Sequence, residues 1–244
     1  MKERPILFSG PMVRAILDGR KTQTRRVLKI QPPTDFDIPI FDGSGYGFFA
    51  DIPDENYMDN WPDSDSPIIC PYGKPGDRLW VRETWATTTN VLGDSDWPLR
   101  PCVAIEWDED EPAVPECATI FRADGEWPWI DDCGVPAELE NGKPQSFWKP
   151  SIFMPRWASR ITLEITNVRV ERLQEISGAE CDSEGIVPGN DPNWGRGLAG
   201  VHDEIRVIRA AFAEAWDKIN GKKHPWDSNP WVWVIEFQTV NSTN

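Results

Sequence analysis

The sequence predicts a mixed α+β protein, in which a small barrel or half-barrel of strands is decorated by two or three helices. Three observations support this: several alternating segments typical of strands, only one long amphipathic helix pattern, and no repeating strand–helix–strand series. The chain has 244 residues. That length suits one domain with insertions, so we expect residues 1–244 to form a single domain.

The first elements follow from a short apolar run and a glycine. Residues 6–8 are apolar and predict a short strand. Residues 11–17 predict a short helix, because apolar side chains recur on one face and Pro11 suits a first turn. Gly19 is expected to end that helix as its C-cap. Residues 22–30 then form an extended segment that carries basic side chains.

The middle of the chain holds shorter strand patterns. A Pro-Gly-Asp turn at residues 75–77 precedes residues 78–85, which alternate as one strand should. Residues 103–107 and 119–122 are weaker strand candidates within acidic, proline-rich sequence.

The last third has the clearest patterns. Residues 159–173 alternate over a length that fits a long strand or a hairpin. Residues 176–184 resemble a short helix closed by Gly185. Residues 204–219 carry an apolar stripe at helical spacing, and residues 231–240 predict a closing strand.

Charge is unevenly distributed along this acidic chain, whose formal net charge is −15. Residues 1–34 are basic, whereas residues 35–66 contain no Lys or Arg and residues 101–145 contain only two. We expect these two acidic segments to be long insertions on a more neutral scaffold. The net charge argues against unspecific binding to nucleic acid.

Other compositional features exclude several classes of site. The five cysteines form no C-x-x-C pair and only two histidines occur, so we expect no metal, no disulfide framework and no cofactor. No apolar run approaches a membrane span, and the N-terminus does not open a signal peptide. We therefore expect a cytoplasmic protein without a membrane partner. Phosphate-binding loops, nucleophile elbows and zinc-protease motifs are also absent.

The most informative stretch is residues 19–26, Gly-Arg-Lys-Thr-Gln-Thr-Arg-Arg. It resembles the G-x-K-x-x-x-x-R signature of ASCH domains, which are relatives of the PUA fold. Residues 75–85, 154–161 and 229–237 resemble further blocks of the phage and prophage ASCH proteins. The resemblance implies a PUA-like mixed β-barrel with a cleft, into which the acidic segments are inserted.

Some small ASCH proteins are amidohydrolases that deacylate N4-acetylcytidine with a lysine, a threonine and a glutamate. The resemblance assigns these roles to Lys21, Thr24 and Glu184, and Glu180 and Asp182 are alternatives for the carboxylate. It implies an N4-acylated cytosine nucleoside as the partner, or RNA or modified DNA in a binding module without chemistry. An acidic protein that imitates nucleic acid is a third, weaker hypothesis.

The chemistry of these groups suits amide hydrolysis. Thr24 needs a base to become a nucleophile, and Lys21 can be that base if its pKa is lowered. We expect repulsion from Arg20, Arg25 and Arg26 to lower it. Glu184 would pass a proton to the leaving nitrogen or hold the cytosine amino edge. Candidate substrate-binding residues are Phe8, Arg26, Glu83, Trp85 and Trp157, whose aromatic members could stack on the pyrimidine.

Overall fold

The computed structural model describes residues 1–31, 40–41, 47–49, 68–89, 100–101, 117–124, 148–186 and 201–240. Most of the acidic residues 35–66 and 101–145, and the strand predicted at residues 103–107, lie outside this part. The chain divides into two compact units. Unit 1 comprises Met1–Arg4, Ala15–Trp80 and Ile161–Asn244, and unit 2 comprises Pro5–Arg14 and Val81–Arg160.

The described elements confirm the mixed α+β class. The strands are β1 (Glu3–Leu7), β2 (Gln23–Val27), β3 (Ile40–Phe41), β4 (Gly47–Phe49), β5 (Ile68–Ile69), β6 (Arg78–Arg82), β7 (Trp85–Thr89), β8 (Arg100–Pro101), β9 (Cys117–Phe121), β10 (Thr162–Arg172) and β11 (Trp231–Val240). The helices are α1 (Gly10–Leu17), α2 (Gly178–Ser183) and α3 (Val201–Asn220), accompanied by short 3-10 turns.

The main sheet has the strand order β1-β6-β10-β11-β2. Its centre is the long antiparallel pair of β10 and β11, and β11 pairs with β2 on its other side. The described strands do not close into a barrel, so the predicted barrel is not confirmed. Two small three-stranded sheets, β3-β4-β5 and β8-β7-β9, accompany the main sheet.

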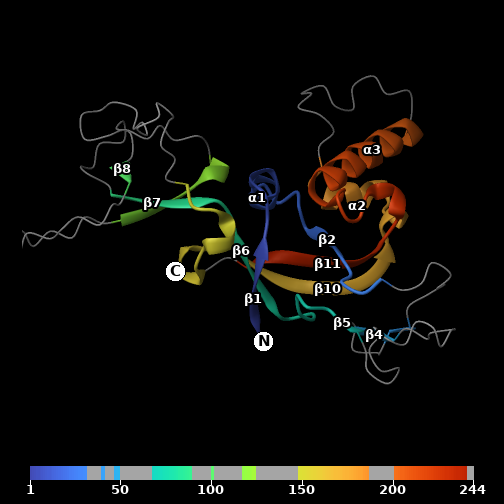
Figure 1. The fold of residues 1–244 in the computed structure, drawn as a ribbon, viewed down its shortest axis with the longest axis horizontal. Coiled ribbons are helices and arrows are strands. Elements are labelled where there is room, and N and C mark those ends of the chain that lie inside the picture. The colour runs from blue at the N-terminus through green and yellow to red at the C-terminus, as the bar shows by residue number, and fades with distance from the viewer. Residues whose placement is uncertain are drawn as a thin grey trace, which may run out of the picture. The chain divides into compact units, whose positions relative to one another are not determined.

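Helices α2 and α3 cover one face of the main sheet in unit 1 (Figure 1). A buried apolar cluster joins them, with Cys181 from α2, Phe212 and Trp216 from α3, and Val232 and Val234 from β11. The alternation of β11 explains this, because every second side chain points to the helices. The opposite face of β11 is also buried, through Trp233 and Ile235.

The predicted helix cap at Gly19 is confirmed. Gly19 has a φ of +72°, and its N–H donates to the carbonyl of Ile16 at 3.0 Å. Glycine adopts this left-handed conformation without a Cβ penalty. The chain therefore turns sharply after α1, which sends residues 20–22 toward β2.

One predicted strand is wrong in its extent. Residues 78–85 were expected to be continuous, but β6 ends at Arg82 and β7 begins at Trp85. The chain changes partners at this break, because β6 pairs with β10 whereas β7 pairs with β8 and β9. Beside the break, the carbonyl of Thr84 accepts from the N–H of Arg122 at 3.0 Å, and the carboxylate of Glu83 is held by Arg160 at 3.0 Å. In the part of the chain that is described, no helix is long and apolar enough to cross a membrane.

Candidate functional site

The turn after α1 brings Lys21 against the end of α2. The N–H groups of Arg20 and Lys21 both donate to the carbonyl of Ala15 at 2.9 Å. Lys21 then pairs with Glu184 as an isolated antiparallel bridge. A Cβ on Gly185 would lie 2.7 Å from the Cβ of Ala15 and 3.0 Å from that of Lys21. Glycine at position 185 is therefore what permits this close approach.

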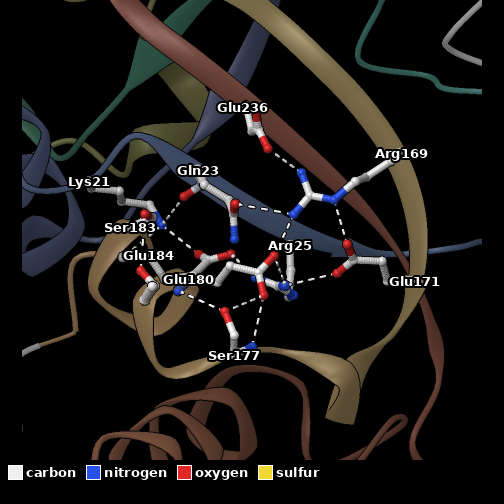
Figure 2. A network of polar contacts seen from close by, with 11 residues as sticks. Lys21, Gln23, Arg25, Arg169, Glu171, Ser177, Glu180, Ser183, Glu184 and Glu236 are labelled. Atoms are coloured by element: carbon white, nitrogen blue, oxygen red, sulfur yellow. Dashed lines mark hydrogen bonds and ion pairs between the residues drawn. The ribbon is translucent and has the colours of Figure 1, made fainter. Parts of the chain in front are cut away.

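The ammonium group of Lys21 is fully buried and donates three hydrogen bonds (Figure 2). Its Nζ lies 2.7 Å from Oε2 of Glu184, 2.9 Å from the backbone carbonyl of Glu184 and 2.8 Å from the carbonyl of Gln23. An ammonium has three protons to donate. The ammonium group is therefore saturated in this arrangement, and a ligand could bond to it only by displacing one of these three oxygens.

The pKa of Lys21 is lowered from its ordinary value. Burial is the largest cause, because it disfavours the charged form. The carboxylate of Glu184 opposes this, whereas the charges of Arg26 and Arg25 add to the lowering. The expected direction therefore holds, but desolvation rather than arginine repulsion dominates. Arg20 has no part in it, since its guanidinium is exposed and pairs with Asp18 at 2.8 Å.

The carboxylate that reaches Lys21 is Glu184, the first of the three candidates. Glu180 instead closes the N-terminus of α2, where its carboxylate accepts from the N–H and the hydroxyl of Ser177, both at 2.8 Å. Burial alone would raise the pKa of Glu180, but these hydrogen bonds and the charges of Arg25 and Arg169 hold it below its ordinary value. Asp182 is exposed.

Arg25 connects the lysine pair to a wider ionic network. Its guanidinium lies 3.0 Å from Glu171, 3.1 Å from Glu180 and 3.4 Å from Glu184. Arg169 in turn pairs with Glu171, Glu180 and Glu236 (Figure 2). The two arginines therefore share the carboxylates of Glu171 on β10 and Glu180 on α2, and these shared ion pairs tie α2 to the sheet.

Three members of this network, Arg169, Glu171 and Glu236, were not predicted from the sequence. Arg169 and Glu171 are two residues apart on β10, so their side chains lie on one face. Their spacing within a predicted strand was the sequence feature from which a pair of charged side chains on one face could have been predicted. The register of the sheet, which no local pattern contains, adds Glu236 opposite Gln23.

Gln23 contributes an unusual buried amide to this network. It is 3% exposed, and its Oε1 accepts from Arg169 at 3.5 Å. Its Nε2 is buried and finds no acceptor among the described residues. A buried donor without a partner costs on the order of 1–3 kcal/mol. Gln23 is therefore a ready donor for a carbonyl or an oxyanion.

Thr24 and Arg26 alternate to the other face of β2 from Gln23 and Arg25. Their register partners on β11 are Ile235 and Trp233. Thr24 is 3% exposed, and Arg26 lies over the ring of Tyr72, 5.9 Å from its centroid. Burial is the largest cause that lowers the pKa of Arg26. The structure thus joins Lys21 to Glu184 directly, whereas Thr24 follows on the opposite face of the same strand.

Among the described strands β2 is the outermost on its side of the main sheet, and the lysine pair lies at its outer edge. The carbonyl of Thr22 accepts from the N–H of Phe237 at 2.8 Å, and the N–H of Leu28 donates to the carbonyl of Trp231 at 3.0 Å. Even-numbered residues therefore bond to β11, and the carbonyl of Gln23 points away from it. Lys21 caps that carbonyl.

The other predicted substrate-binding residues all belong to unit 2. Phe8 and Trp85 are buried in its core, at 5% and 4% exposure. Trp157 is 70% exposed and meets Trp85 edge-on, with ring centroids 5.7 Å apart. Glu83 is buried against Arg160. Their predicted roles beside Lys21 remain predictions.

Chemically, the Lys21 site combines a lysine of lowered pKa, a carboxylate in contact with it and an unsatisfied amide donor. Such a set can move a proton between nitrogen and oxygen and can stabilise a developing negative charge. Comparison of the chain with models of protein families, with curated proteins and with solved structures finds no match.

Proposed function

We propose that this chain is an amidohydrolase of the ASCH type, with a PUA-like core, that removes the acyl group from N4-acylated cytosine nucleosides. The contact that carries the proposal is the buried pair of Lys21 and Glu184, whose Nζ and Oε2 are 2.7 Å apart. A lysine becomes a base only when its environment disfavours the ammonium form, and burial supplies that condition here.

The pair also suggests how the base is released. Glu184 is the main group that raises the pKa of Lys21. When substrate displaces the carboxylate, a proton passes from Lys21 to Glu184, and burial together with Arg25 and Arg26 keeps the amine neutral. Before substrate binds, the ion pair with Glu184 keeps the amine of Lys21 protonated, so that it cannot act as a base.

The reaction then proceeds in two balanced steps. The hydroxyl of Thr24 gives its proton to the neutral amine of Lys21 and attacks the acyl carbon, while the amide of Gln23 donates to the oxyanion. This step requires the side chains of Thr24 and Lys21, which lie on opposite faces here, to be brought together when substrate displaces Glu184. The C–N bond breaks as Glu184 gives its proton to the N4 nitrogen. Water next attacks the acyl–threonine ester and gives a proton to Glu184, and Thr24 regains its proton from Lys21. Proton return from Glu184 to Lys21 restores the pair.

The test is release of cytidine from N4-acetylcytidine and N4-benzoylcytidine, followed by absorbance. We expect turnover by the wild-type chain and a loss of about 10²-fold or more in Lys21→Met, Thr24→Ala and Glu184→Gln. An exposed lysine, threonine and carboxylate close by in the sequence serve as matched controls. The variants Lys29→Met, Thr22→Ala and Asp182→Asn should retain activity. Absence of turnover in the wild type, or equal activity in Thr24→Ala and Thr22→Ala, contradicts the proposal.

One observation favours a binding module as the second candidate. All three ammonium protons of Lys21 are accepted by protein oxygens, which is the geometry of a structural ion pair as well as of a resting base. A module of this kind would bind N4-acetylcytidine in a calorimetric titration without releasing cytidine. Binding without turnover would therefore replace the first proposal by the second.

A further inference from the structure

Unit 2 contains a cavity of about 390 Å³ that the Lys21 site does not use. Small-molecule sites commonly have volumes of a few hundred cubic ångströms. The residues that matter in its lining are Gly10, Arg14, Glu83, Thr84, Arg122 and Ala123. They come from α1, from the break between β6 and β7, and from the 3-10 turn Arg122–Asp124.

Hydrogen bonds hold the walls of this cavity together. The Nη1 of Arg14 donates to the carbonyl of Ala123 at 3.0 Å, and the N–H of Arg122 donates to the carbonyl of Thr84 at 3.0 Å. A Cβ built on Gly10 would lie 3.9 Å from both Arg14 Nη1 and the Cα of Ala123. Gly10 thus faces the guanidinium of Arg14, and a larger side chain there would extend across this wall.

The acidic member of the lining is already neutralised. Glu83 is 2% exposed, and its two oxygens accept from Nε and Nη2 of Arg160 at 3.0 and 3.1 Å. Arg160 also binds Asp124 through two hydrogen bonds of 2.8 Å. Burial raises the pKa of Glu83, although Arg160 opposes this. Glu83 therefore adds little uncompensated negative charge to the cavity.

The two basic members of the lining, Arg14 and Arg122, are solvent-exposed and receive no such compensation from the described part of the chain. Within the described residues, no carboxylate lies at ion-pair distance from Arg14 or Arg122. A cavity with paired acid and unpaired guanidinium groups attracts an anion, and guanidinium binds carboxylate and phosphate with charge-assisted hydrogen bonds.

We infer that this cavity binds a small organic anion, whose carboxylate or phosphate group is held by Arg14 and Arg122. The inference does not depend on the proposed amidohydrolase activity, because it uses none of the residues of the Lys21 site. The ring or chain of the ligand fills the remaining volume beside Thr84 and Gly10.

Calorimetric titration of the full chain tests the inference with three probes of matched size. Benzoate and phenyl phosphate carry the two anionic groups, and benzyl alcohol is the neutral control. We expect at least one anion to bind and benzyl alcohol not to bind. The stronger of the two anions identifies whether carboxylate or phosphate is preferred.

Two variants locate the binding. Arg122→Gln should weaken the anion about tenfold or more, as loss of a hydrogen bond to a charged group predicts, and Gly10→Leu should weaken it by filling the cavity. Lys218→Gln removes an exposed charge in unit 1 and should bind as the wild type does. Unfolding in urea checks that each variant folds. Absence of anion binding, equal binding of benzyl alcohol, or wild-type affinity in both cavity variants would overturn the inference.

Discussion

A lysine with no exposure to solvent is the least ordinary residue in this chain. Lys21 retains its ammonium only because Glu184 and two backbone carbonyls replace the water that it has lost. A pair of this kind ties stability and reactivity together, since whatever withdraws the carboxylate changes the protonation of the amine. Residue-scale experiments should therefore detect Lys21 in the pH dependence of folding.

The first prediction concerns Lys21→Met. The pKa of Lys21 is lower in the folded state than its ordinary 10.5, so the unfolded chain binds more protons between the two values. Stability gained from this residue therefore rises with pH in that window. The difference in free energy of unfolding between wild type and Lys21→Met, measured in urea from pH 7 to 10, should grow with pH.

The exposed Lys29→Met is the control, and its difference from wild type should stay flat over the same range. Lys21→Met also leaves Glu184 without its main partner, which costs on the order of 3–5 kcal/mol when such a pair is broken. The double variant Lys21→Met/Glu184→Gln should recover part of this loss. A flat or falling difference for Lys21→Met would contradict the lowered pKa.

The second prediction concerns the buried thiols. Burial raises the pKa of Cys181 to about 12 and that of Cys70 to about 11, and the thiolate is the reactive form. Both should react with iodoacetamide at pH 8 far more slowly in the folded chain than in urea. Peptide mass mapping measures this, and labelling of either residue at the rate of the unfolded chain would disprove it.

At the scale of elements, helix α2 begins with a capping box. The hydroxyl of Ser177 accepts from the N–H of Glu180 at 3.3 Å, and the carboxylate of Glu180 accepts from the N–H of Ser177. The third prediction is that Ser177→Ala lowers the free energy of unfolding by about 1 kcal/mol. Urea unfolding measures the loss.

The matched control lies at the other end of the same helix. The hydroxyl of Ser183 donates to the carbonyl of Ala179 one turn earlier, at 3.1 Å, and does not cap the helix. Ser183→Ala should therefore change stability by less than about 0.5 kcal/mol. Equal effects of the two substitutions would show that the cap does not stabilise α2.

Elements with a strong local pattern could be predicted from the sequence. Residues 231–240 coincide with β11, and the segment at 159–173 forms the single strand β10. The break between β6 and β7 could not be predicted, because the alternation continues through Glu83 and Thr84. The break lies where the chain leaves its pairing with β10 for pairing with β8 and β9, and these partners are distant in sequence.

The Lys21 site shows the same division. The turn at Gly19 was predicted because a helix cap is a local pattern. Lys21 and Glu184 were assigned through the ASCH resemblance, which left Glu180 and Asp182 as alternatives to Glu184. The opposite orientations of Lys21 and Thr24 depend on the alternation of β2, and the network around Arg169 depends on strand register. Both need the sheet to be assembled.

At the scale of the whole molecule, the net charge of −15 opposes binding to polyanions. The fourth prediction is that the full chain shows no binding to a 20-nucleotide RNA at about 150 mM salt in fluorescence anisotropy, because phosphate repulsion acts over the Debye length. A nucleoside carries no phosphate and escapes this repulsion. Salt-sensitive RNA binding under these conditions would instead favour the nucleic-acid module.

The mixed α+β fold class could be predicted from the order of the elements. Whether the sheet closes into a barrel could not. The described strands end at β1 on one side and β2 on the other rather than meeting, and no sequence pattern states whether two distant edges pair. The prediction of one domain with acidic insertions stays a prediction.

The outer edge of β2 has a consequence for solubility. An uncovered sheet edge invites a strand from another molecule, which leads to association and aggregation. Here the ammonium group of Lys21 donates to the carbonyl of Gln23 that points outward from this edge. The bridge between Lys21 and Glu184 also places the end of α2 beside the edge. The Lys21–Glu184 pair, which holds the lysine proton in the proposed reaction, therefore also hinders the addition of a strand. Substitutions that open it should be judged by light scattering as well as by activity.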